Sequence, residues 1–145
     1  MEEKIEMNRE EELAKYLSLI EYYKDQLNSI EIQSSYLQAA IAEYYKTRMT
    51  VEQLNKISDG NEILIPVGGS TFINACIKNP SKVLFDIGAG IVTEKTVDDA
   101  IKKINQRIEN LQETQKKLLS IAQQLQNEAA EISKKMQKLI SEEKE

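Results

Sequence analysis

Hydrophobic residues recur every three or four positions over the last third of the chain. Alternating steps of four and three from residue 97 reach thirteen positions, of which twelve are apolar and one is Gln115. Such a 3.5-residue repeat is typical of a coiled-coil seam and predicts a helix over 97–142. Thr96 is a suitable N-cap, and Asp98 and Asp99 would face the positive end of the helix dipole. The positions are Val97, Ile101, Ile104, Ile108, Leu111, Gln115, Leu118, Ala122, Leu125, Ala129, Ile132, Met136 and Leu139.

A similar series near the N-terminus predicts a second coiled-coil helix over 10–57. It runs through Leu13, Tyr16, Ile20, Tyr23, Leu27, Ile30, Ser34, Leu37, Ile41, Tyr44, Arg48 and Val51. Ser34 and Arg48 interrupt it and could fix the register at some cost in stability. Other apolar residues lie off the seam, either as single exposed side chains or as contact surface for a partner. These are Leu17, Leu19, Tyr22, Ile32, Tyr36 and Tyr45.

The segment between the two helices collects all the residues that interrupt helices. All five Gly and both Pro lie between positions 60 and 90. Apolar and β-branched runs there predict strands at 62–67, 70–78, 82–88 and 91–94, paired as two β-hairpins. Cys76, on the second strand, is expected to be a buried packing residue. Because this insert is short, the two helices are expected to pair antiparallel.

Both faces of the predicted hairpins carry apolar side chains, and two hairpins are too little sheet to bury them. Their open edges would also invite further strand pairing. We therefore expect strands from several chains to close a shared barrel, which makes the insert an oligomerisation element. The residues expected to serve oligomerisation are Ile63, Ile65, Val67, Phe72, Ile73, Ile77, Val83, Phe85 and Ile87.

Composition removes several classes of function from consideration. The 145 residues include no His and one Cys, which excludes a His-dependent triad, a His metal site and an internal disulfide. The net charge of −5, without a basic block, disfavours nucleic acid as a partner. Because the chain has no His, no P-loop pattern and no recognisable pocket, no enzyme activity, metal or cofactor is expected. Without an apolar N-terminal segment or paired Cys, the chain is expected in the cytoplasm and not in a membrane.

Residues 62–100 closely resemble the hairpin region of the α-type subunit of prefoldin, a co-chaperone of archaea and eukaryotes. The matching features are the Pro-containing first strand before Gly68, the Asp86–Gly90 segment and the Thr-Glu-Lys that follows it. Two hairpins also fit the α class, since the β class carries one. The resemblance implies a single α+β domain over 1–145. In it, an antiparallel two-helix coiled coil carries two central β-hairpins that complete a β-barrel between subunits.

The resemblance also implies a function. Two α and four β subunits would form a hexamer that holds unfolded polypeptides without ATP and delivers them to a group II chaperonin. From the antiparallel geometry we expect client binding at the coiled-coil tip, unless the seam residues there only complete the coiled coil. The candidates are Leu13, Tyr16, Leu17, Ile20, Ile132, Met136, Leu139 and Ile140. The alternatives are a structural coiled-coil adaptor and a filament-forming prefoldin relative.

Overall fold

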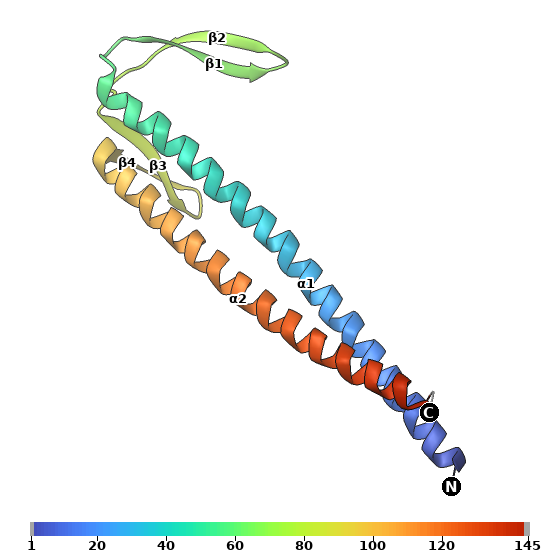
Figure 1. Cartoon of the computed structure of the whole chain (residues 1–145). Coiled ribbons are helices and arrows are strands. Elements are labelled where there is room, and N and C mark those ends of the chain that lie inside the picture. The colour runs from blue at the N-terminus through green and yellow to red at the C-terminus, as the bar shows by residue number, and fades with distance from the viewer. Residues whose placement is uncertain (1, 144–145) are drawn as a thin grey trace. The chain divides into compact units, whose positions relative to one another are not determined.

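The computed structural model describes residues 2–143, as two long helices with two β-hairpins between them in sequence (Figure 1). Helix α1 spans Glu2–Gln53 and is followed by a 3-10 turn, η1, at Leu54–Lys56. The strands are β1 (Glu62–Gly68), β2 (Thr71–Cys76), β3 (Lys82–Gly88) and β4 (Ile91–Thr96), and helix α2 spans Val97–Glu143. This order confirms the predicted α+β class. No helix in the described range is long and apolar enough to cross a membrane.

These elements form two compact units, which are described separately below. The terminal unit contains residues 2–38 and 112–143, and the hairpin unit contains residues 39–111. Each unit includes part of both helices, and the hairpin unit also contains all four strands.

Helix α1 begins at Glu2 instead of the predicted residue 10. The first residues lack the apolar period that marked the rest of the helix, so the seam could not reveal them. They nevertheless include three Glu together with Lys4 and Arg9, which favour helix, and Glu2 and Glu3 lie favourably at the positive end of the helix dipole. At its other end α1 stops at Gln53, and η1 replaces the last predicted turn.

The predicted seams are confirmed by burial. Every position of both 3.5-residue series is buried or half-buried, whereas the residues between them are mostly exposed. The apolar residues predicted to lie off the seam of α1 are all exposed, with Tyr36 retaining 75% of its accessible surface. The seam period therefore separates helix-pairing residues from surface residues in both units.

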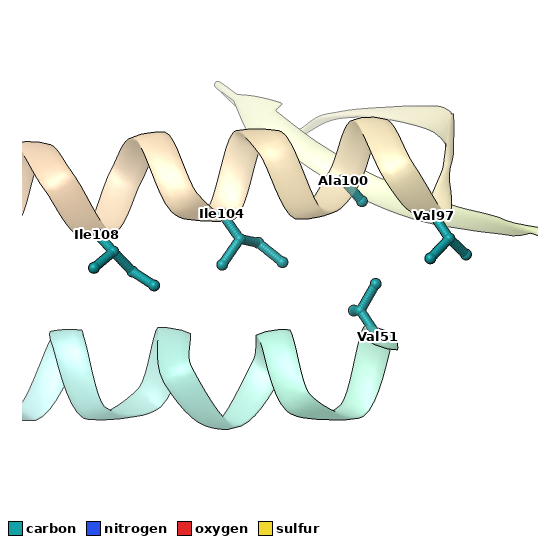
Figure 2. Packing of buried hydrophobic residues seen from close by; sticks show 5 residues of the cluster. All are labelled: Val51, Val97, Ala100, Ile104 and Ile108. Carbon is teal, nitrogen blue, oxygen red and sulfur yellow. The ribbon is translucent and has the colours of Figure 1, made fainter. Parts of the chain in front are cut away.

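The core of the hairpin unit lies where the end of α1 faces the start of α2. Figure 2 shows Val51 of α1 pointing toward the row formed by Val97, Ala100, Ile104 and Ile108 of α2. Ile104 keeps only 1% of its surface exposed, so this packing contributes much of the stabilisation that the unit has.

The start of α2 is fixed by the predicted N-cap. The Oγ1 atom of Thr96 accepts a hydrogen bond from the backbone N–H of Asp99 at 3.2 Å. This bond satisfies one of the free N–H groups of the first turn, and it sets the point at which strand β4 becomes helix α2.

The two hairpins are separate two-stranded antiparallel sheets of the same design. Gly68 pairs with Thr71 and Gly88 with Ile91, each after an irregularity in the ladder. Both residues of each turn, 69–70 and 89–90, have positive φ angles, which is the requirement of a type I′ hairpin turn. Strands β1 and β3 start at residues 62 and 82, and strands β2 and β4 at 71 and 91, twenty positions apart in both cases.

The predicted burial of Cys76 is wrong. Cys76 is exposed in the chain, not buried. Cys76 shares its face of the hairpin with Glu62, its cross-strand partner, and with Leu64 and Phe72, and all of these side chains are exposed, so alternation along β2 does not bury Cys76. The strand is also shorter than the predicted 70–78.

Candidate functional site

The two helices meet near their chain-terminal ends through residues that the sequence singled out. Leu13 of α1 and Leu139 and Ile140 of α2 line one small cavity of about 20 Å³, together with Arg9 and Glu10. This volume is about enough for one water molecule, so the helices are nearly in contact there. Leu13 and Leu139 are half-buried, whereas Ile140 is exposed. The structure therefore brings three of the eight predicted tip residues together.

The other five predicted residues lie on the same two helices within two turns of this contact. Leu17 is exposed, with 50% of its surface accessible, and the remaining four are half-buried: Tyr16, Ile20, Ile132 and Met136. The hydroxyl of Tyr16 donates a hydrogen bond to the Oε1 atom of Glu12 at 3.1 Å, and this bond, with a smaller effect of burial, raises the pKa of Tyr16. Seam residues here pack the coiled coil and still present part of their surface to solvent.

The same unit exposes apolar residues that the site prediction missed. Ile5 and Met7, in the first turns of α1, keep 54% and 62% of their surface, and Leu19 is also exposed. The sequence does mark Leu19 as a candidate, because it is apolar and lies off the seam. Ile5 and Met7 were missed because the helix was expected to begin only at residue 10. The exposed apolar surface thus extends further toward the N-terminus than predicted.

Two polar interruptions of the seam lie together in the terminal unit. Ser34 of α1 and Gln115 of α2 line one groove of about 990 Å³, whose walls also include Leu27, Leu118 and the exposed Leu119. Neither a serine nor a glutamine fills a seam position as leucine does, so the helix pair is loosely packed at this layer.

Tyr23 of the same unit has a raised pKa. Burial is the main cause, and the charge of Glu128 and its hydrogen bond with Tyr23 add to it.

The third polar interruption, Arg48, lies in the hairpin unit and is satisfied across the helix pair. Its Nη1 atom donates to Oδ1 of Asn105 at 2.8 Å, and its guanidinium lies 4.8 Å from the ring centroid of Tyr45. A hydrogen bond between two seam-side polar groups is directional, so it favours one alignment of α1 against α2.

Strands β1 and β2 expose four of the nine residues predicted for oligomerisation. Ile65 pairs with Ile73 across the ladder, and both are exposed, as are Val67 and Phe72. Ile63 and Ile77 are half-buried. This hairpin therefore carries uncovered apolar side chains on both faces, which is an unfavourable state for a sheet in water.

Strands β3 and β4 are covered on one face only. Val83 and Phe85 pack against the helix cluster of their own chain, whereas Ile87 is exposed. The opposite face carries Leu84, with 76% of its surface accessible, and Val92. Both faces have apolar residues in the sequence, so alternation alone could not tell which face packs on the helices.

The exposed apolar side chains of the helices and hairpins are suited to contact with other proteins. Within residues 2–143 no group of three or more Cys, Asp or Glu side chains is placed to hold a metal ion. The features that distinguish this chain are exposed apolar side chains, which lie on both hairpins and along both helices, the chain-terminal ends included.

Comparison with known proteins decides the family. The family model described as prefoldin subunit matches residues 23–142, which is most of the chain. The chain belongs to the prefoldin family. A relative named prefoldin subunit alpha, from Archaeoglobus fulgidus, is 30% identical over 130 residues, covering 90% of this chain and 95% of the relative. Another of that name, from Thermofilum pendens, is 35% identical over 101 residues, covering 70% and 76%.

Solved prefoldin structures share the fold. A filamentous prefoldin from Methanocaldococcus jannaschii is 26% identical, with a TM-score of 0.59 over 86% of this chain and 98% of that one. The prefoldin β subunit from Thermococcus strain KS-1 is 17% identical, with a TM-score of 0.56 over 87% and 90%, and supports the fold alone. Family membership confirms the resemblance found in the sequence and supports a chaperone-type role for this prefoldin chain.

Proposed function

We propose that this chain is the α-type subunit of a cytoplasmic prefoldin hexamer that holds unfolded polypeptides without ATP and delivers them to a group II chaperonin. The observation that carries this proposal is the exposed apolar surface near the chain-terminal ends of the two helices. Leu17 and Ile140 are exposed, and Ile140 lines the small cavity between Leu13 and Leu139, so the helix pair presents apolar side chains from both helices.

Client binding would follow from burial of apolar surface. Each Å² removed from water contributes about 25 cal/mol, so partial coverage of one or two side chains gives only a weak contact. Several such surfaces in one assembly would hold an unfolded chain by avidity, while each contact stays easily reversible. Met136 adds an adaptable side chain to the surface, which suits clients of varied sequence.

Assembly would use the hairpins. The apolar faces of β1–β2 and the outer face of β3–β4 are exposed to water in the single chain. Strands of β-type subunits in a shared barrel would bury them. Two α and four β subunits are the composition that we propose. Membership of the prefoldin family, with relatives named as its alpha subunit, supports this partner class.

The test combines a mass measurement with an aggregation assay. The chain is mixed with a β-type prefoldin subunit, and native mass spectrometry gives the mass of the complex. Light scattering then measures the aggregation of a chemically denatured client that is diluted into the complex. The double variant Leu17→Ser/Ile140→Ser should assemble normally and lose at least half of the protection. Leu119→Ser removes an exposed leucine from the groove of the same unit and is the matched control, with protection expected to stay intact.

Two results would contradict the proposal. If the wild-type chain forms no defined complex or leaves aggregation unchanged, the hexameric holdase is wrong. If the complex protects the client equally well with and without Leu17 and Ile140, the site assignment is wrong although the function stands.

A filament-forming relative is the second candidate, because one similar solved structure is a filamentous prefoldin. It predicts open polymers of this chain alone, which electron microscopy of the purified chain would reveal. A structural adaptor, in contrast, predicts one native partner and no effect on unrelated denatured clients.

A further inference from the structure

The two hairpins differ in how firmly they are attached to the helices of the hairpin unit. Val83 and Phe85 of β3 lie against the helix cluster, so β3–β4 is packed on the body of its own chain. The corresponding residues of β1, Ile63 and Ile65, do not belong to that cluster, and Ile65 is exposed.

Arg107 of α2 is the polar contact that joins β3 to both helices. Its Nη2 atom donates a hydrogen bond to the backbone carbonyl of Asp86 at 3.1 Å, and Nη1 donates to the hydroxyl of Tyr44 on α1 at 3.3 Å. The guanidinium carbon also lies 4.6 Å from the ring centroid of Phe85 and 5.9 Å from that of Tyr44. One side chain thus holds a strand, an aromatic ring of that strand and the opposite helix.

The hydrogen bonds at the base of β1–β2 are different in kind. The N–H of Gly60 donates to the carbonyl of Ile77 at 2.8 Å, and the N–H of Ile77 donates to the carbonyl of Asn61 at 2.9 Å. The N–H of Asn79 donates to Oδ1 of Asp59 at 2.9 Å. All three bonds close the stem of the hairpin between its own flanking residues, so they keep it paired without fixing its position on α1 or α2.

We propose that Arg107 is a positioning residue that holds β3–β4 in place on the helices before assembly, whereas β1–β2 becomes fixed only when a partner subunit covers it. The assembly part of this inference rests on the proposed function. A hairpin already held in its bound position loses less conformational freedom on association. The outer face of β3–β4, with Leu84 and Val92, is therefore preorganised for contact with a partner subunit. The flat fork of arginine suits this role because it can stack on Phe85 and donate in two directions at once.

The positioning part is tested on the free chain by hydrogen exchange. In the wild type, the paired amides of β3 and β4 should exchange more slowly than those of β1 and β2. Arg107→Gln should speed exchange in β3–β4 about tenfold, as expected for the loss of a charged hydrogen bond, and leave β1–β2 unchanged. Arg107→Lys, which keeps the charge but not the fork, should give a smaller acceleration. Circular dichroism confirms that both variants keep their helices.

Arg48→Gln is the matched control, because Arg48 also bonds across the helix pair but contacts Asn105 and not a strand. It should leave exchange in β3–β4 at the wild-type rate. Equal protection of the two hairpins in the wild type, or equal acceleration by both arginine variants, would overturn the positioning role.

The assembly part is tested by stopped-flow mixing with a β-type prefoldin subunit. Arg107→Gln should slow formation of the complex severalfold while leaving its final mass unchanged, and Arg48→Gln should not slow it. An unchanged rate in Arg107→Gln would overturn the link to assembly. If the wild-type chain does not assemble, the proposed function fails, and the exchange data on the free chain still decide whether Arg107 positions β3–β4.

Discussion

Thr93 carries its hydroxyl on the face of β4 that is turned toward the helices. It lies directly across the ladder from Phe85, which packs on the helix cluster. Its Oγ1 atom is buried and has no hydrogen-bond partner within the described residues. A buried hydroxyl without a partner costs free energy, and valine has the same shape without that cost.

Thr93→Val should therefore raise the free energy of unfolding by about 1 kcal/mol. Urea denaturation followed by circular dichroism measures this change. Thr71→Val is the control, because the hydroxyl of Thr71 is exposed and donates to the carbonyl of Gly69 at 3.3 Å, so no gain is expected there. A Thr93→Val chain that is less stable than wild type would show that the hydroxyl is satisfied in solution.

At the scale of the elements, the loosely packed layer between α1 and α2 in the terminal unit can be tested by filling it with larger apolar side chains. Ser34 and Gln115 line the same groove, and both occupy seam positions that leucine fills in a regular coiled coil. Ser34→Leu combined with Gln115→Leu should stabilise the chain by about 2 kcal/mol through added apolar burial.

Thermal unfolding of this double variant measures the gain as a rise in Tm. Ser120→Leu, at an exposed position of α2, should leave the Tm nearly unchanged because it adds no buried surface. A lower Tm in the double variant would mean that the groove cannot accept two leucines and that the polar layer is needed for the packing seen.

The helices were more predictable from the sequence than the hairpins. A 3.5-residue period states which side of a helix is buried, so the seam, including the breaks at Ser34 and Gln115, could be read directly. The hairpins have apolar residues on both faces, so neither the packing of Phe85 nor the exposure of Leu84 could be inferred. Arg107 gave no signal at all, because only the folded chain brings it to Asp86.

The candidate site was predictable in part, namely where its residues lie on the recognisable part of the helices. Leu17 and Ile140 stood out because they are apolar and off the seam, and both are exposed. Ile5 and Met7 were missed because no period extends that far. Whether any of these residues binds a client depends on surfaces outside this chain, which a single sequence does not contain.

At the scale of the whole molecule, assembly should depend on the face of β1–β2 that carries Ile65 and Ile73. Ile65→Lys combined with Ile73→Glu places an opposite-charge pair at facing positions of the ladder, which keeps the hairpin paired while removing the apolar pair from that face. The variant should remain a monomer when mixed with β-type subunits, as measured by sedimentation velocity. Ile32→Lys with Tyr36→Glu, at exposed positions of α1, is the matched control and should assemble normally.

Retained assembly in the Ile65/Ile73 variant would place the interface elsewhere on the hairpins. The outer face of β3–β4, with Leu84 and Val92, would then be the next surface to change.

The twenty-residue spacing of the strands has a consequence for how such a chain can vary. Leu64 and Leu84 match at this spacing, as do Gly68 and Gly88, and the positive φ angles of the turns recur at it. The insert is thus one structural module present in two copies. Excision of residues 61–80 would remove one complete copy and leave α1 and α2 untouched, so the heptad phase of neither helix would change. A duplication or loss of this module would alter how many strands a subunit contributes without redesigning its coiled coil.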